Sequence, residues 1–340
     1  MRKHFNRTIH LMRLLLLFVL VTTTAANAQF IGTQDQWIEQ LNLKGALPEK
    51  LLSTRTAVFY DYTLTQKELL DAQQYFQRTG IDAVAYFELD MVMAGKDVTR
   101  AFADYVLKRE VTNLIFIEKR DSDYRIAATA FNGKESVIDP SQQAWSATNK
   151  VLTEALKELY KTASSQQKKI NMLINELPET GLTIDPIMGK RNEFFAIDAK
   201  VDPLAVPKTG DEQVDKELEE IFNNNYSLKF KMTSKEVTEK EMRKQGLLYV
   251  LCVIRTRDVV AKDLLGYDMT SAESALVSVT YADTQQQLKN IPSNTIVYKF
   301  YFKHIDSGNV FLGTKWDADL TWQQALLNQL KGMKAELHLN

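Results

Sequence analysis

An order of apolar patterns that occurs twice along this chain limits it to a narrow class of folds. Each copy follows a Leu-Pro-Glu tripeptide, at 47–49 and again at 177–179. Short apolar runs, typical of buried strands, alternate with segments whose apolar residues recur every three or four positions, typical of helices. Such alternation predicts an α/β fold. The copies share few identical residues, so an internal duplication and a coincidence between common α/β patterns are both open.

The first copy is expected to form a sheet with helices between its strands. Strands are expected at 57–62, 83–87, 114–117 and 124–130. The sequence Thr65-Gln-Lys-Glu68 is a capping box, in which a hydroxyl and a carboxylate satisfy the free N–H groups at the start of a helix. Further helices are expected over 98–106 and in a closing segment that contains Trp145.

The second copy repeats this order with extra strands. Strands are expected at 194–199, 228–232, 247–254, 275–281, 296–302 and 310–316. Capping boxes are expected at 209–212 and 233–236, and the closing helix contains Trp322. The sequence therefore predicts an α/β fold of the α+β sandwich type. It consists of two similar domains, each a mixed β-sheet in the order β-α-β-α-β-(β)-α with helices packed on the sheet.

The two copies divide the chain into four parts. These are a leader, a first domain, a connecting segment and a second domain, at 1–28, 29–160, 161–192 and 193–340. Ile170, Leu173, Ile174 and Leu177 keep helical spacing within the connecting segment. We therefore expect a connecting helix that is docked on a domain, with a flexible tether as the alternative.

The first 28 residues have the three parts of a cleavable secretory signal. Basic residues come first, an apolar run follows at 14–21, and Ala26-Asn27-Ala28 supplies the small residues of a cleavage site. The apolar run is shorter than the roughly 20 residues that span a bilayer. We expect a periplasmic or secreted protein with no transmembrane segment after cleavage.

Charge and composition argue against several functions. Removal of the leader leaves 38 basic and 43 acidic residues, a net charge of −5, which argues against nucleic-acid binding. The mature chain has no glycine-rich phosphate loop, two histidines and a single cysteine, Cys252, within an apolar run. We expect no cofactor, no metal site of the histidine- and cysteine-rich kind, and a buried thiol.

Three carboxylates are the only candidates for catalysis. Asp61 lies near the end of the first expected strand, and Glu88 and Asp90 lie near the end of the second. If these strands are parallel, the three groups meet at one edge of the sheet, where α/β proteins bind ligands. They would supply an acid and a base, or oxygen ligands for a divalent cation. The alternative is that they are solvated groups at strand ends.

One strand has aromatic or apolar groups on both faces. Its candidate partner-binding residues are Tyr298, Phe300, Tyr301, Phe302 and, beyond the turn, Trp316. A strand that meets water on one face normally alternates with polar residues. Either a helix covers the second face, or that face binds another molecule.

These features favour an exported, non-enzymatic protein of the cell envelope that binds a protein partner or a small ligand. The alternative is a secreted hydrolase that uses the strand-end carboxylates, with or without a divalent cation. A third hypothesis places a small molecule in the cleft between the two halves, where pockets often form.

Overall fold

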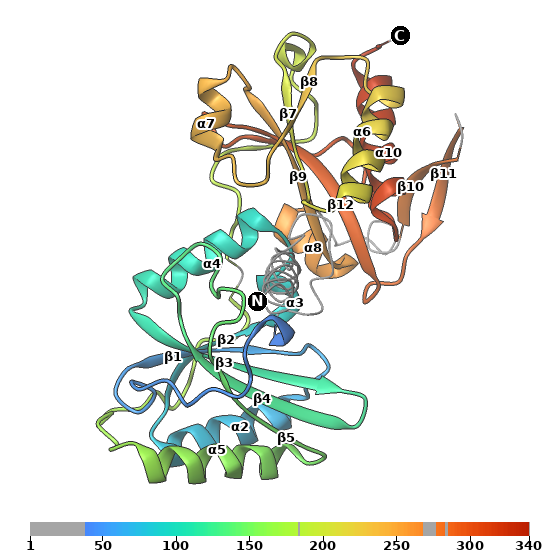
Figure 1. Ribbon diagram of the computed structural model, residues 1–340. Coiled ribbons are helices and arrows are strands. Elements are labelled where there is room, and N and C mark those ends of the chain that lie inside the picture. The colour runs from blue at the N-terminus through green and yellow to red at the C-terminus, as the bar shows by residue number, and fades with distance from the viewer. Residues whose placement is uncertain (1–37, 183, 268–276, 283–284, 340) are drawn as a thin grey trace, which may run out of the picture.

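The expected α/β architecture is confirmed: two mixed β-sheets carry helices packed on their faces (Figure 1). The computed structural model describes residues 38–182, 184–267, 277–282 and 285–339. The expected leader at 1–28 lies outside these residues. We call residues 38–166 the first lobe and residues 191–339 the second lobe.

The first lobe is built on a five-stranded sheet in the order β2-β1-β3-β4-β5. Its strands are β1 (Arg55–Tyr60), β2 (Asp82–Glu88), β3 (Val111–Arg120), β4 (Asp123–Ala130) and β5 (Trp145–Asn149). Strand β1 is parallel to β2 and β3, whereas β4 and β5 continue the sheet in antiparallel pairs. The short 3-10 helix η2 (Ile38–Gln40) comes before the first strand.

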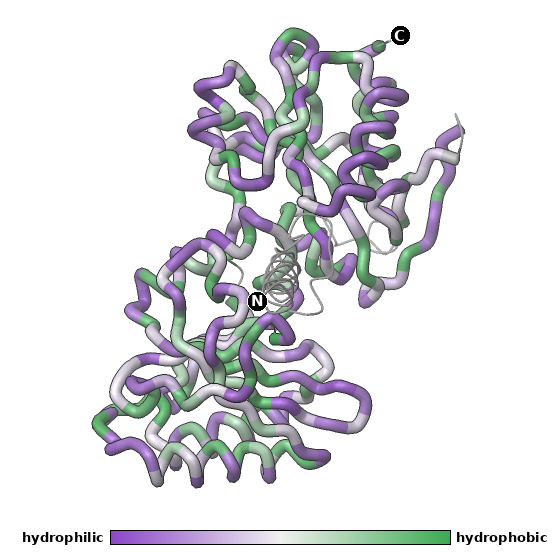
Figure 2. The backbone as a smooth tube through the Cα atoms, in the orientation of Figure 1, coloured by the Kyte–Doolittle hydropathy of each residue, from purple (hydrophilic) through white to green (hydrophobic). Residues whose placement is uncertain are grey.

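Helices cover both faces of this sheet. Helices α2 (Gln66–Thr79) and α5 (Leu152–Gln166) pack on one face, and α4 (Lys96–Lys108) packs on the other after the single turn α3 (Leu89–Val92). In Figure 2, α5 alternates between hydrophobic and hydrophilic residues along its length, as expected of a helix with one buried face.

Local sequence explains where α2 begins and ends. The capping box is formed: the Thr65 hydroxyl accepts from the Glu68 N–H, and the Glu68 carboxylate accepts from the Thr65 N–H. The helix ends at Gly80, whose φ of 98° lies in the left-handed region that side chains disfavour. The capping box predicted from the sequence is therefore confirmed.

The second lobe is built on a six-stranded sheet in the order β6-β13-β12-β9-β7-β8. Its strands are β6 (Arg191–Asn192), β7 (Leu204–Pro207), β8 (Phe230–Thr233), β9 (Tyr249–Arg257), β12 (Ile296–His304) and β13 (Val310–Phe311). Helices α6 (Glu212–Asn225) and α10 (Trp322–Glu336) cover one face, and α7 (Glu239–Lys244) lies on the other. The remaining elements are η3 (Ile197–Lys200), α8 (Asp258–Leu265) and a hairpin of β10 (Val277–Ala282) and β11 (Gln285–Asn290).

The two sheets share one strand order. Read from its other end, the second sheet runs β8-β7-β9-β12-β13, which matches β2-β1-β3-β4-β5 of the first, and β6 is added at the edge. The parallel and antiparallel pairs also correspond. In each lobe the first and last long helices share one face of the sheet.

The connecting segment differs from the expected helix. Helix α5 ends at Gln166, and the chain then runs without helix along β2, where Glu179 forms a bridge with Ala85. The Asn171 side chain donates to the carbonyls of Thr54 and Gly80, so a polar side chain competes with helical pairing. Leu173 and Leu177, expected to dock, are 90% and 87% exposed.

Three expectations for the second lobe were wrong in position. The strand expected at 194–199 is absent, and β7 at 204–207 takes its place in the sheet. Helix α6 begins at the cap Asp211 without a capping box, because the Thr209 hydroxyl donates to Asp215 instead. The box expected at 233–236 is replaced by one between Thr238 and Glu241, which begins α7.

A similar shift occurs in the first lobe, where Trp145 begins β5 and lies outside the closing helix that was expected to contain it.

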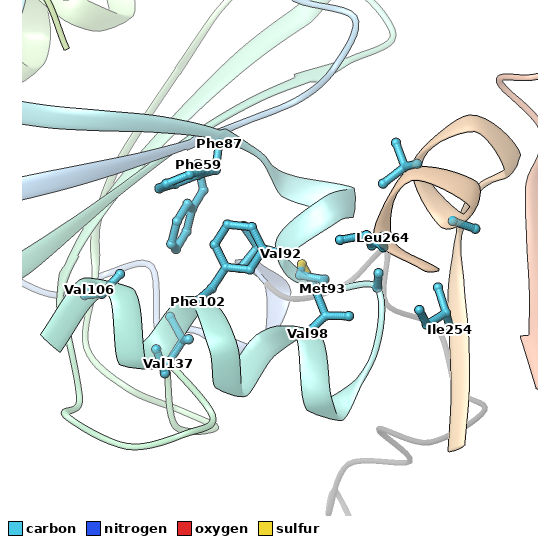
Figure 3. Close-up of a cluster of buried hydrophobic side chains, with 14 of the residues drawn as sticks. Phe59, Phe87, Val92, Met93, Val98, Phe102, Val106, Val137, Ile254 and Leu264 are labelled. Carbon is cyan, nitrogen blue, oxygen red and sulfur yellow. The ribbon is translucent and has the colours of Figure 1, made fainter. Parts of the chain in front are cut away.

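One hydrophobic core is continuous between the lobes. Val92, Met93 and Val98 of the first lobe belong to the same buried cluster as Ile254 and Leu264 of the second (Figure 3). Three further clusters lie within single lobes: one beneath α2 and α5, one beneath α6 and α10, and a small one beneath α7. The lobes are therefore joined by packed side chains as well as by the connecting segment.

Candidate functional site

A cavity of about 510 Å³ lies between the two lobes. The first lobe contributes five residues between 93 and 99 together with 135–136, and the second lobe contributes from β7, β9, β12, α7 and the loops beside them. Pockets that hold small organic ligands commonly have volumes of about 300–1,000 Å³. The space between the halves that the sequence left as a third hypothesis is thus present as a cavity.

The first-lobe wall is the turn from α3 into α4. Gly95 is the N-cap residue of α4 and packs against the backbone of β9: a Cβ at this position would lie 2.5 Å from the Val253 carbonyl oxygen. The neighbouring Ala94 carbonyl accepts a hydrogen bond of 2.7 Å from the Arg255 N–H. Only glycine permits this approach, so the wall is fixed against the second sheet.

The second-lobe wall includes the carboxyl ends of two parallel strands. Pro207 ends β7 and is followed by Lys208 and Thr209, and Lys235 to Val237 follow β8. This is the edge at which open α/β sheets usually bind ligands. The Thr209 hydroxyl and N–H both donate to Asp215, which holds the loop at the start of α6.

The floor of the cavity is largely apolar. Val250 and Cys252 of β9, Tyr301 of β12 and Met242 of α7 line it. Cys252 is only partly buried, and burial raises the pKa of its thiol well above the usual value. The thiol therefore stays protonated and contributes a small, weakly polar surface.

An ion cluster closes one side of the cavity. The Lys303 ammonium lies 2.7 Å from Asp97 Oδ2 and 2.6 Å from Glu239 Oε1, and Arg100 lies 2.9 Å from Asp97 Oδ1. Burial alone would lower the pKa of Lys303, but the Asp97 and Glu239 carboxylates nearby raise it. The cluster links α4 of the first lobe to α7 and β12 of the second.

The three candidate catalytic carboxylates lie outside this cavity. Glu88 and Asp90 both accept hydrogen bonds from the Arg257 guanidinium, with Arg257 Nε 2.6 Å from Asp90 Oδ2. The face of the Tyr62 ring lies 4.1 Å from the same guanidinium. Asp61 accepts from the N–H and hydroxyl of Thr63.

These acids lie at the end of the parallel strands β1 and β2, and Glu88 and Asp90 are ion-paired with Arg257 there. Burial raises the pKa of Glu88; Arg257 opposes this effect, and Asp90 and Asp61 add to it. Arg257 belongs to the second lobe, so Glu88 and Asp90 form an ion-paired contact between the lobes. Among the described residues, no group of acidic, histidine and cysteine side chains has the arrangement of a metal site.

The aromatic strand requires a correction. Phe300 and Phe302 are buried beneath α10, and Tyr301, 2% exposed, and Trp316 are buried in the core shared by the lobes. Tyr298 is half-buried and lies against Arg255. Helices and the first lobe cover both faces, so the exposed partner-binding surface proposed for these five residues is not present.

Two lysines within the apolar strand β12 are a sequence feature that indicates buried polar partners. Lys299 and Lys303 alternate with aromatic residues along β12, on the same side of the strand as Tyr301. A lysine within an otherwise apolar strand needs a buried partner. The partner of Lys303, Asp97, lies 206 positions away, so no local pattern identifies it.

Comparison with protein-family models, curated proteins and solved structures found no match for this chain. Across the described ranges, no helix combines the length and the apolar character needed to cross a membrane.

Proposed function

We propose that this protein is an exported, non-enzymatic binding protein of the cell envelope that holds a small molecule in the cavity between its lobes. The cavity of about 510 Å³, with its apolar floor, is the observation that carries the proposal. Export rests on the secretory pattern of residues 1–28. The shared strand order of the two sheets supports an origin by internal duplication, with the cavity at the contact between the copies.

The other two functional hypotheses have less support. The hypothesis of a protein partner is not supported by the aromatic strand, because Phe300, Tyr301 and Phe302 are buried. A hydrolase needs a carboxylate that is free to exchange a proton. Glu88 and Asp90 instead both bind the guanidinium of Arg257, so each carboxylate is held in an ion pair between the lobes.

The proposal is tested with N-phenyl-1-naphthylamine, a neutral dye whose fluorescence increases in apolar surroundings. The folded mature protein is expected to bind it. Cys252→Phe places a ring in the cavity and is expected to weaken binding by about tenfold or more, roughly 1.4 kcal/mol. Cys252→Ala leaves the space open and serves as the matched control.

Circular dichroism and thermal unfolding establish that each variant is folded before its affinity is compared. No binding by the folded wild-type protein, or equal binding by the Phe and Ala variants, would contradict the proposed site.

A further inference from the structure

We infer that the ligand is an amphipathic anion, with its apolar body on the cavity floor and its negative group between Lys96 and Lys208 at the rim. This inference rests on the proposed function and adds the chemical class of the ligand. Its basis is the charge that is left over after the ion pairs around the cavity are assigned.

The ion cluster inside the cavity is balanced. Lys303 and Arg100 supply two positive charges, and Asp97 and Glu239 supply two negative charges within 4 Å of them. A balanced and mutually bonded cluster has little need of a charge from a ligand. The cluster forms one polar side of the cavity. Because it is neutral, the charged residues of the rim determine which ligand charge is favoured.

The acidic groups of the rim already have partners or cationic neighbours. Glu236 accepts a hydrogen bond from the Ser234 hydroxyl. Glu135 lies close enough to Arg100 to help raise the pKa of that guanidinium. Within the described part of the chain, neither carboxylate forms an ion pair with Lys96 or Lys208.

Two lysines of the rim have no such partner. Lys96 and Lys208 are exposed, and neither side chain forms an ion pair or hydrogen bond with any of the described residues. Lys96 begins α4 in the first lobe, and Lys208 follows β7 in the second, so they approach from opposite walls. Lys96 is near enough to the floor to influence the Cys252 thiol.

A third lysine lies on the side of Lys208. The Lys235 ammonium would be 3.0 Å from a Cβ at Gly210, which places it over the loop that contains Lys208. Lys96 and Lys208 are thus positive charges at the rim that no ion pair balances within the described ranges. This local excess occurs in a chain whose formal net charge is −1, so the rim attracts anions that the rest of the surface repels.

The contrast between the lobes supports this assignment. In the first lobe the corresponding strand ends, after β1 and β2, carry Asp61 and Glu88. In the second lobe the ends of β7 and β8 are followed by Lys208 and Lys235. Equivalent positions of the same topology therefore carry opposite charge, and only the basic edge borders the cavity.

The test compares two dyes with the same ring systems. 1-Anilinonaphthalene-8-sulfonate carries a sulfonate, and N-phenyl-1-naphthylamine lacks it. The wild-type protein is expected to bind the anionic dye more tightly. The Lys96→Met/Lys208→Met variant is expected to lose about tenfold or more of its affinity for the anionic dye and to keep its affinity for the neutral dye within about twofold.

The matched control is Lys67→Met/Lys216→Met, which makes the same change in net charge at side chains that are 88% and 79% exposed, on α2 and α6. It is expected to bind both dyes as the wild type does. Raising the salt concentration is expected to weaken the binding of the anionic dye only, because salt screens exposed charges.

Three results would overturn the inference while leaving the proposed function intact. The first is equal affinity of the wild type for both dyes. The second is that the Lys96/Lys208 variant loses affinity for both dyes to the same extent. The third is that the control variant loses as much affinity for the anionic dye as the Lys96/Lys208 variant does. Failure of the neutral dye to bind the wild type would reject the proposed function itself, and the inference with it.

Discussion

Lys299 lies in the interior of the second lobe, and its ammonium group donates to three acceptors. These are the Leu312 carbonyl, the Asp317 carboxylate and the Gln329 side-chain oxygen. Burial lowers the pKa of Lys299 and raises that of Asp317, and each partner opposes the effect of burial on the other. The two groups therefore depend on each other for their charge.

We expect Lys299→Met to lower the free energy of unfolding by about 3–5 kcal/mol, because it leaves the Asp317 carboxylate buried without a cation. Urea unfolding followed by circular dichroism measures the change. Lys299→Met combined with Asp317→Asn is expected to be less damaging than the single substitution. If Asp317→Asn lowers the free energy of unfolding as much in the Lys299→Met background as it does alone, the two residues are not coupled.

At the residue scale, sequence patterns locate groups on a strand but do not identify their partners. Glu88 and Asp90 were expected together because both lie at the end of one predicted strand. Arg257 is 169 and 167 positions from them and belongs to the other lobe. No pattern of neighbouring residues predicts such a contact.

At the scale of single elements, the start of α2 shows how one carboxylate serves two structures. Burial alone would raise the pKa of Glu68, but hydrogen bonds from the Tyr124 hydroxyl and from the N–H and hydroxyl of Thr65 lower it to about 2. Glu68 thus caps its own helix and also binds a residue of β4.

The lowered pKa of Glu68 gives a stability term that depends on pH. The ionised group is favoured in the folded state, so its contribution is complete above the ordinary value near 4.5 and is lost as the pH falls toward about 2. We expect Glu68→Gln to be less stable than the wild type at neutral pH, and the difference to shrink between about pH 4.5 and 2.

Urea unfolding at several pH values measures this difference. Glutamine keeps an oxygen that accepts hydrogen bonds, so the loss at neutral pH should be about 0.5–2 kcal/mol, the range found for helix caps. A difference that stayed constant from pH 7 to pH 2 would show that the charge of Glu68 has no part in it.

Elements with strong local signals were predicted well, and those that depend on tertiary contacts were not. Helix α2 was expected at its capping box, and β3 and β9 were expected from continuous apolar runs. The helix expected around Leu173 did not form, because its spacing was helical but its polar residues bond to the first lobe. Periodicity describes what a segment can bury, whereas the rest of the chain decides whether it does.

At the scale of the whole molecule, the approach of Gly95 to β9 joins the two lobes. A methyl group at this position would meet the Val253 carbonyl oxygen at 2.5 Å, which is closer than atoms pack. We expect Gly95→Ala to lower the free energy of unfolding by about 1–3 kcal/mol, the usual effect of overpacking. We also expect it to weaken binding of the neutral dye, because the cavity wall must move.

Gly332→Ala is the control, since Gly332 lies within α10 and a Cβ there meets nothing within 4 Å. This substitution is expected to raise the free energy of unfolding by about 0.5–1 kcal/mol, because alanine loses less entropy in a helix. Urea unfolding compares the two variants. Equal effects of the two would show that the contact between Gly95 and Val253 is not tight.

The architecture was accessible from the sequence, but the site was not. Alternating strands and helices predicted two mixed sheets, and the sheets share one strand order. The cavity is formed by residues as far apart as Met93 and Lys303, which meet only when the lobes pack together. A pattern read along the chain has no access to that contact.

The walls of the cavity come from both lobes, and this has a consequence for the amount of folded protein. A molecule that binds only the folded form stabilises it by RT ln(1 + [L]/Kd), which is about 2.7 kcal/mol at a hundredfold excess over Kd. Copies without ligand unfold more often and are exposed to proteases for longer. The lifetime of the protein would then follow the supply of its ligand.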